Sequence, residues 1–241
     1  MPETAHRKNL ILPLTVAVLA AAVLVAALVG RPDDGTAQDG EAPASVTAGE
    51  SGPDSAPDPL ADLPRRDADD PVAKGSPDAP VVLVVYSEFQ CPFCGKFARD
   101  TAPALEERYV ADGTLRIEWR DFPYLGPEST TAALAGRAAA AQDRFWEFHD
   151  AMYADQLPPN SGGLDADHVE AVARDLGLDV ERFRDDMAAG RTRDLVADDF
   201  EEGRQIGVTG TPSFVINGTP VVGAQPLEVF EQVIEDAAAG S

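Results

Sequence analysis

The residues of this chain best suited to chemistry are two cysteines, Cys91 and Cys94, and no other cysteine occurs in the 241 residues. A C-x-x-C pair beside a strand-to-helix junction is typical of a redox-active dithiol, whereas a second pair or paired histidines would indicate zinc. The chain has no second pair, and its three histidines, His6, His149 and His168, are scattered. The spacing therefore favours redox chemistry over a bound metal or an inert structural disulfide.

A buried strand and a helix are predicted to position the two cysteines. Residues 81–86 are apolar throughout and mostly β-branched, which is typical of a central strand covered by helices on both faces. From Pro92 to Gly113 apolar side chains recur every three or four residues, which predicts a helix. Residues 115–120 then alternate apolar and charged side chains, so we expect a second strand with one buried face and a β-α-β unit.

Helices and a hairpin complete the predicted α/β order. Apolar stripes predict several helices between about residues 126 and 206, one of them after an Asp165 cap. Asn217-Gly218 lies between two short apolar runs, and this dipeptide is a strong hairpin signal because both turn positions need positive φ. An amphipathic helix is predicted from Pro226 to the end of the chain.

The N-terminal thirty residues predict a single membrane anchor. Residues 10–30 form an almost unbroken apolar run, which is long enough to cross roughly 30 Å of hydrocarbon as a helix. A signal-peptide core is usually about 7 to 15 residues, so the length favours a retained anchor, although the small residues 25–27 leave cleavage open. Basic residues precede the run, which places residues 1–9 in the cytoplasm and the remainder outside the inner membrane.

Residues 31–70 are predicted to be a disordered acidic linker. The stretch 31–80 holds nine prolines, five glycines and twelve acidic against four basic residues, with no aromatic residue. Such a composition cannot bury enough apolar surface to offset the entropy of ordering the chain. We therefore place one folded domain at residues 71–241. The formal net charge of -23 argues against partners that are nucleic acid or anionic lipid.

Four motifs and the order of elements resemble the DsbA-like thiol:disulfide oxidoreductases. The motifs are Ser-Glu-Phe-Gln-Cys-Pro-Phe-Cys (87–94), Arg-Asp-Phe-Pro (120–123), Phe-Trp-Glu-Phe-His (145–149) and Gly-Val-Thr-Gly-Thr-Pro (207–212). The resemblance covers residues 70 to 239 and implies a thioredoxin fold with an inserted helical subdomain at about 126–206. It also implies a protein that needs no cofactor other than its own redox-active disulfide.

Different roles are expected for the two cysteines. Cys91 stands at a helix start, where unpaired backbone N–H groups and the helix dipole favour a thiolate, so it is the expected nucleophile. Cys94 is one turn further and more shielded, and we expect it to resolve mixed disulfides. Pro92 fits the first helical turn because its missing N–H costs nothing there. The resemblance implies that Pro92 and Phe93 tune the redox potential.

The resemblance also implies a substrate-binding loop across from the dithiol. Thr211 and Pro212 would form a cis-proline loop, with Thr211 offering backbone hydrogen bonds to an extended substrate. Glu88 is either a buried proton acceptor coupled to the thiols or a solvated acid at a strand end. His149 is expected to satisfy its ring nitrogens within the helical insert rather than to take part in catalysis.

These features together predict a membrane-tethered, extracytoplasmic enzyme that passes its disulfide to exported cysteine-containing proteins. A membrane redox partner, which the sequence does not identify, would reoxidise it, and we expect a monomer. A reductase or isomerase stays open as an alternative, because the direction of exchange depends on reduction potential rather than on the motif. A carrier of a soft metal such as Cu(I) would use the two thiolates, although no methionine or histidine accompanies them in sequence.

Overall fold

The computed structural model of the chain describes residues 59–241. The predicted cytoplasmic N-terminus (1–9), the predicted anchor (10–30) and most of the predicted linker lie outside the described residues. From residue 59 onward, every helix is too short or too polar to serve as a membrane span.

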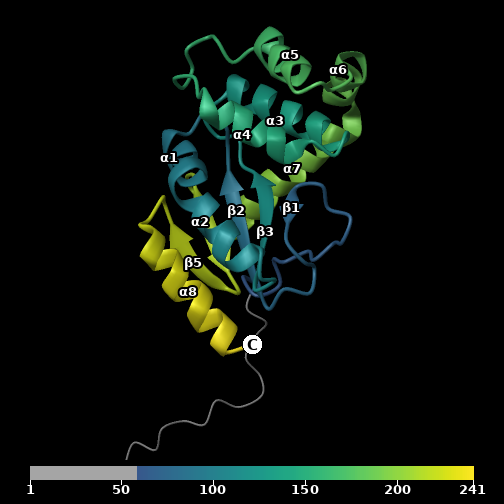
Figure 1. Cartoon of the computed structure of the whole chain (residues 1–241). Helices are drawn as coiled ribbons and strands as arrows, with labels where there is room; N and C mark the ends of the chain where they lie inside the picture. Colours follow the sequence, from purple (N-terminus) through teal and green to yellow (C-terminus); the bar gives the residue numbers. More distant parts are fainter. Residues whose placement is uncertain (1–58) are drawn as a thin grey trace, which may run out of the picture. The chain divides into compact units, whose positions relative to one another are not determined.

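A five-stranded sheet in the order β1-β3-β2-β4-β5 forms the centre of the described part (Figure 1). β2 (Val81–Ser87) pairs in parallel with β3 (Leu115–Asp121) and antiparallel with β4 (Ser213–Ile216). The short strand β1 (Ala73–Lys74) and the hairpin strand β5 (Thr219–Val222) are the antiparallel edges. The predicted β-α-β unit and the predicted hairpin are confirmed.

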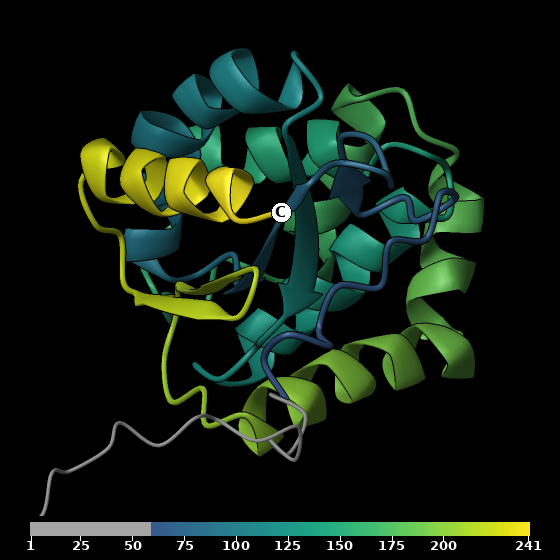
Figure 2. The same ribbon diagram turned by 90° about the horizontal axis from the view of Figure 1, so that it is seen from below.

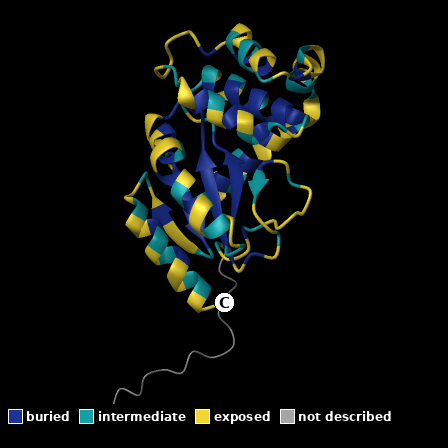
Figure 3. Ribbon diagram, viewed as in Figure 1, coloured by how far each residue is buried: buried dark blue, intermediate teal, exposed yellow. Residues whose placement is uncertain are grey.

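Every residue of β2 is buried (Figure 3). Alternate side chains enter two separate apolar clusters, with Leu83 and Val85 in the larger one and Val84 and Tyr86 in the smaller one. A strand covered on both faces carries apolar side chains at every position rather than at every second one. The prediction of a central strand is therefore confirmed.

One helical rod connects β2 to β3 and packs beside the C-terminal helix. It consists of α1 (Pro92–Lys96), a π-helical stretch (Phe97–Thr101), α2 (Ala102–Leu105) and a second π-helical stretch (Glu106–Val110). Figure 2 shows the rod lying along α8 (Leu227–Ala239). Three aromatic rings join the rod, the sheet and α8, with centroids 4.5 to 5.3 Å apart: Phe97, Phe214 and Phe230.

The predicted helical insert between β3 and β4 is confirmed, and it consists of five helices. Figure 1 shows α3 to α6 gathered beyond the carboxyl ends of β2 and β3, while α7 runs back along the sheet. The insert comprises α3 (Pro127–Ala140), α4 (Phe145–Ala154), α5 (Ala166–Asp175), α6 (Val180–Ala188) and α7 (Gly190–Gln205).

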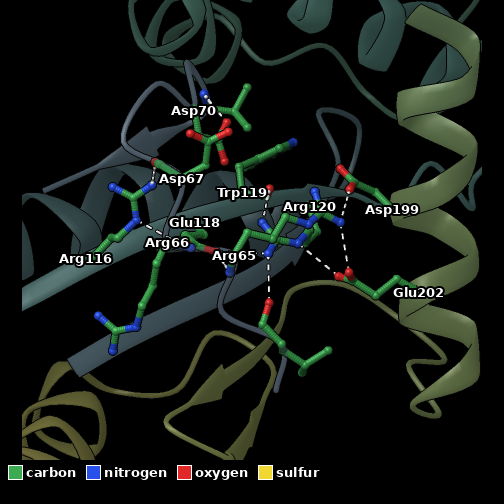
Figure 4. A network of polar contacts seen from close by, with 12 residues as sticks. Arg65, Arg66, Asp67, Asp70, Arg116, Glu118, Trp119, Arg120, Asp199 and Glu202 are labelled. Atoms are coloured by element: carbon green, nitrogen blue, oxygen red, sulfur yellow. Dashed lines mark hydrogen bonds and ion pairs between the residues drawn. The ribbon is translucent and has the colours of Figure 1, made fainter. Parts of the chain in front are cut away.

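The polar face of β3 differs from the prediction because it is buried as well. Glu118 and Arg120 are fully buried, and Arg116 is 2% exposed. Buried charges are tolerated when they are paired and hydrogen-bonded. Glu118 accepts from Arg116 and Arg120 at 2.9 Å each, and Arg120 also pairs with Glu202 of α7 at 2.9 Å (Figure 4).

The same charges fix a segment that the composition had assigned to the linker. The backbone N–H groups of Arg65 and Arg66 donate to the Glu118 carboxylate at 2.9 and 2.8 Å, and Leu63 is buried. Arg65 also pairs with Asp199 of α7 at 2.8 Å. The folded part therefore begins ahead of the predicted boundary at residue 71, because long-range bonds compensate for the poor local composition.

Removing the central carboxylate of this network is expected to destabilise the protein. Burial alone would raise the pKa of Glu118, but the Arg65 N–H and the Arg116 guanidinium lower it from 4.5 to about 2. Glu118→Gln leaves the buried Arg116 guanidinium without a carboxylate partner and Arg120 with Glu202 alone, so the free energy of unfolding should fall by about 3 to 5 kcal/mol at pH 7. Urea denaturation measures this loss.

The difference in unfolding free energy between wild type and Glu118→Gln should shrink as the pH falls from 4.5 toward 2, because the wild-type carboxylate then becomes protonated too. Lys96→Gln breaks an exposed pair with Asp100 and should leave the stability close to that of wild type, because water screens exposed ion pairs. Equal losses in the two variants would contradict the prediction.

Candidate active site

Cys91 lies at the junction between the central strand and α1. It is the N-cap of α1, with extended backbone at φ -70° and ψ 119°, and Pro92 occupies the first turn. The backbone N–H groups of Phe93 and Cys94 are directed at its sulfur and lower its pKa. The helix start thus provides the anion-favouring environment that the sequence predicts.

The start of β4 lies across from this sulfur. Tyr86 of β2 is paired with Ser213 of β4, which brings the segments that flank these strands together. The Thr211–Pro212 peptide bond is cis, as the resemblance implies. The Cys91 thiol donates to the Thr211 carbonyl oxygen at 3.2 Å.

The two cysteines have opposite acidities. A hydrogen bond from the Cys94 thiol is the main reason that the pKa of Cys91 falls from 9.0 to about 6, against the opposing effect of burial. Burial and the neighbouring Cys91 raise the pKa of Cys94 well above its usual value. These shifts favour a thiolate at Cys91 and a protonated thiol at Cys94 at neutral pH.

The Thr211 side chain is placed to respond to this charge. Its hydroxyl is buried and has no hydrogen-bond partner among the described residues. It lies beside both sulfurs and favours their ionised forms. Deprotonation of Cys91 supplies an acceptor for this hydroxyl, so Thr211 can stabilise the thiolate.

Glu88 is buried beneath the motif, which excludes the alternative of a solvated acid. The Ser129 hydroxyl of α3 donates to one carboxylate oxygen, and the other has no partner in the described part of the chain. Gln90 in turn donates to the Ser129 hydroxyl oxygen at 2.7 Å. Burial, and next the Cys91 charge, raise the pKa of Glu88 from 4.5 to about 7 although the Ser129 bond lowers it. Glu88 is therefore electrostatically coupled to Cys91.

Gln156 holds the active-site loop and was not found from sequence. Its amide nitrogen donates to the carbonyl oxygens of Phe89 and Cys91, at 2.9 Å each. A Cβ atom on Gly95 would lie 2.2 Å from the Gln156 amide oxygen, so the absence of a side chain at 95 makes room for this clamp. No local pattern marks Gln156, because its partners are more than sixty residues away.

The rim of the site is exposed although the sulfurs are not. Phe93 is 63% exposed and Tyr124 is 42% exposed. Cys91 is 3% exposed and Cys94 1%. Tyr124, which sequence reasoning missed, lies near the Thr211 hydroxyl and the Cys91 charge. Within residues 59–241, no cluster of three or more His, Cys, Asp or Glu side chains is arranged to hold a metal ion.

Comparisons with known proteins agree with this geometry. The model of the Thioredoxin family matches residues 67–236. The probable disulfide bond formation protein D of Bacillus cereus is 30% identical over 148 residues, which cover 60% of this chain and 68% of that protein. The Na(+)/H(+) antiporter NhaA 1 of Salinispora arenicola is 33% identical over 177 residues, or 73% of this chain. The match spans only 26% of the antiporter's length.

A solved structure supports the fold. BdbD from Bacillus subtilis, in its oxidised form, superimposes with a TM-score of 0.66 at 20% identity, over 70% of this chain and 93% of that one. At this identity the likeness concerns the fold, and it confirms the predicted thioredoxin fold with a helical insertion.

Loss of the Cys94 thiol should make Cys91 less acidic. Because a hydrogen bond to a charged group contributes about 1.5 to 3 kcal/mol, Cys94→Ala should raise the pKa of Cys91 to about 7 or 8. Ultraviolet absorbance of the thiolate against pH measures this, and Cys91→Ser should show no such titration. A pKa that stays at about 6 in Cys94→Ala would contradict the assigned hydrogen bond.

Glu88 should make the reduced protein less stable as the pH rises. Its pKa is raised from 4.5 to about 7, so between these values the folded state binds more protons than the unfolded state, and stability declines with pH. Glu88→Gln removes that decline, so relative to wild type the variant should gain about 3 kcal/mol across this range. Denaturation at several pH values tests it, with exposed Glu107→Gln as the control. If the stability of Glu88→Gln falls with pH as steeply as that of wild type, Glu88 does not titrate in this way.

Proposed function

The chain belongs to the thioredoxin family, among its DsbA-like thiol:disulfide oxidoreductases, and we propose that it exchanges disulfides with exported proteins through Cys91 and Cys94. The observation that carries this proposal is the acidic Cys91 thiol at the start of α1, hydrogen-bonded to the Thr211 carbonyl oxygen. The relative named for disulfide bond formation supports the same chemistry.

The exchange proceeds through a mixed disulfide. A substrate thiolate attacks the Cys91 sulfur of the oxidised protein, the bond to Cys94 breaks, and Cys94 leaves with the electron pair and takes up a proton. A second substrate thiolate then attacks the substrate sulfur of the mixed disulfide, which releases Cys91 as a thiolate. The reaction needs no cofactor other than the Cys91–Cys94 disulfide.

The acidity of Cys91 favours the oxidant direction. A pKa of about 6 means that the reduced protein is stabilised as a thiolate at neutral pH, and a stabilised reduced form makes the disulfide a stronger oxidant. A reductase would need the opposite balance. We therefore propose net transfer of the disulfide to the substrate.

Substrate recognition is proposed at the cis-proline loop and the rim. Thr211 and Pro212 would align an extended segment beside the dithiol, and the exposed Phe93 and Tyr124 rings offer apolar contact at the rim. Pro92 and Phe93 are proposed to tune the redox potential. Neither contact requires a folded partner surface, which suits a flexible, cysteine-containing chain.

We further propose that the folded domain works outside the inner membrane as a monomer, tethered by residues 10–30 and the linker. The apolar run, its basic flank and the acidic linker composition support this placement. A membrane redox partner would return the protein to its disulfide form.

The test is oxidation of a reduced, unfolded substrate, together with the redox equilibrium of the protein against glutathione. Wild type should oxidise the substrate, Cys91→Ser should fall to the background rate, and Cys94→Ala should accumulate mixed disulfides at Cys91. Exposed Lys96→Gln, two residues past the motif, is the matched control and should behave as wild type. Full activity in Cys91→Ser would refute the mechanism. If the Cys91–Cys94 disulfide proves harder to reduce than oxidised glutathione, the protein would be a reductase instead.

A further inference from the structure

A small cavity adjoins the resolving cysteine. Its wall is formed by Cys94, by Ser87 and Tyr153, and by His149 and Glu106, among apolar side chains. About 20 Å³ is open to the centre of a water-sized sphere, which is enough for one water molecule. The hydroxyl, thiol and imidazole groups on the wall give such a water the two to four polar partners that it needs.

His149 connects this cavity with the protein surface. Its Nδ1 lies 2.8 Å from the Asp150 carboxylate, and the Asp150 side chain is 66% exposed whereas that of His149 is 9% exposed. Because a carboxylate only accepts hydrogen bonds, Nδ1 carries the proton of the neutral ring and Nε2 carries the lone pair. Nε2 bonds no other residue within the described range 59–241. A basic nitrogen is thus free on a ring that lines the cavity.

Aromatic side chains hold the ring in place. Tyr153, Trp146 and Trp119 contact it edge to face, with centroids 4.8, 5.1 and 5.4 Å away. The other charged groups that act on His149 are Lys74 and Glu106, which pair with each other at 2.8 Å. The imidazole is therefore fixed between the cavity and Asp150.

We propose that His149 accepts the proton of Cys94, through one water in this cavity, when Cys94 resolves a mixed disulfide. The inference rests on the proposed disulfide exchange and adds the route by which its buried thiol gains and loses a proton. It differs from the expectation that His149 only satisfies its nitrogens within the insert.

The reaction starts from a mixed disulfide between Cys91 and a thiol such as glutathione. The Cys94 S–H bond breaks and a bond forms from the Cys94 sulfur to the Cys91 sulfur. The bond from Cys91 to glutathione breaks, and glutathione leaves with the electron pair as a thiolate. The proton reaches Nε2, and the imidazolium beside the Asp150 carboxylate then releases a proton to solvent. Substrate oxidation returns a proton to Cys94 along the same route.

The acidities fit a proton transfer that accompanies the attack. Burial raises the pKa of Cys94 and lowers that of His149, so the proton stays on sulfur at rest. A neutral imidazole that lines the same cavity as the thiol can then act, through a water, as a general base while the S–S bond forms. Glu106 lines the same cavity, but its carboxylate is already paired with the Lys74 ammonium at 2.8 Å. Glu88 is bonded to Ser129 instead.

The experiment separates formation of the mixed disulfide from its resolution. The reduced full chain is mixed with oxidised glutathione, and rapid acid quench follows attack by Cys91 and the later release of glutathione by Cys94. His149→Gln should form the mixed disulfide at the wild-type rate but resolve it about 100-fold more slowly at pH 7, the lower range for general-base catalysis. Its resolution rate should rise about tenfold per pH unit, as hydroxide replaces the missing base.

Two further variants keep the proposal open to refutation. Glu106→Gln alters the other titratable group on the cavity wall and should resolve at the wild-type rate. Asp150→Asn keeps the ring and changes only an exposed side chain, so it should be slower than wild type and faster than His149→Gln. The proposal fails if His149→Gln resolves with the wild-type rate and pH profile, or if Glu106→Gln is as slow.

The same assay distinguishes failure of the proposed disulfide exchange from failure of the proton route through His149. If wild type forms no mixed disulfide at Cys91, the proposed function fails and not merely the proton route. If His149→Gln also slows formation of the mixed disulfide, the test rests on Asp150→Asn. A wild-type pH profile for resolution in Asp150→Asn would then refute the proposed role of the His149–Asp150 pair.

Discussion

The antiparallel pairing of β2 with β4 is the constraint on which the site depends. Cys91 follows the end of β2 and Thr211 precedes β4, so the two meet only because Tyr86 is opposite Ser213. A slip of one residue would turn every β2 side chain to the opposite face. Burial on both faces of β2 makes such a slip costly, and the same burial therefore fixes the distance between the sulfur and the loop.

Environment, rather than residue type, divides the work between the two cysteines. Both are thiols in one helical turn, yet one faces backbone N–H groups and the other a closed interior, and their pKa values move in opposite directions. The same contrast applies to the carboxyl groups. Glu88, with one orphan oxygen, becomes less acidic, whereas Glu118, surrounded by donors, becomes more acidic.

Local patterns in the sequence were sufficient for elements and motifs but not for long-range contacts. The strand β2 and the Asn217-Gly218 turn can each be predicted from a few consecutive residues. The alternation in β3 also predicted a strand, but its charged face is covered because Glu202 reaches it from α7, 82 positions away. Gln156 was missed because its partners are also far away in sequence. The segment around Arg65 is ordered by a backbone N–H that donates to Glu118, and amino-acid composition gives no sign of such a bond.

The concealment of Cys91 sets a limit on when this protein can act. The sulfur belongs to a residue that is 3% exposed, so an incoming thiol must be carried by a segment that can protrude and adapt. Such segments exist while a newly exported chain is still unfolded and vanish once its own cysteines enter a core. Under the proposed function, oxidation would therefore compete with the folding of the client, and the buried sulfur would limit the time during which a client can be oxidised as well as which of its cysteines can react.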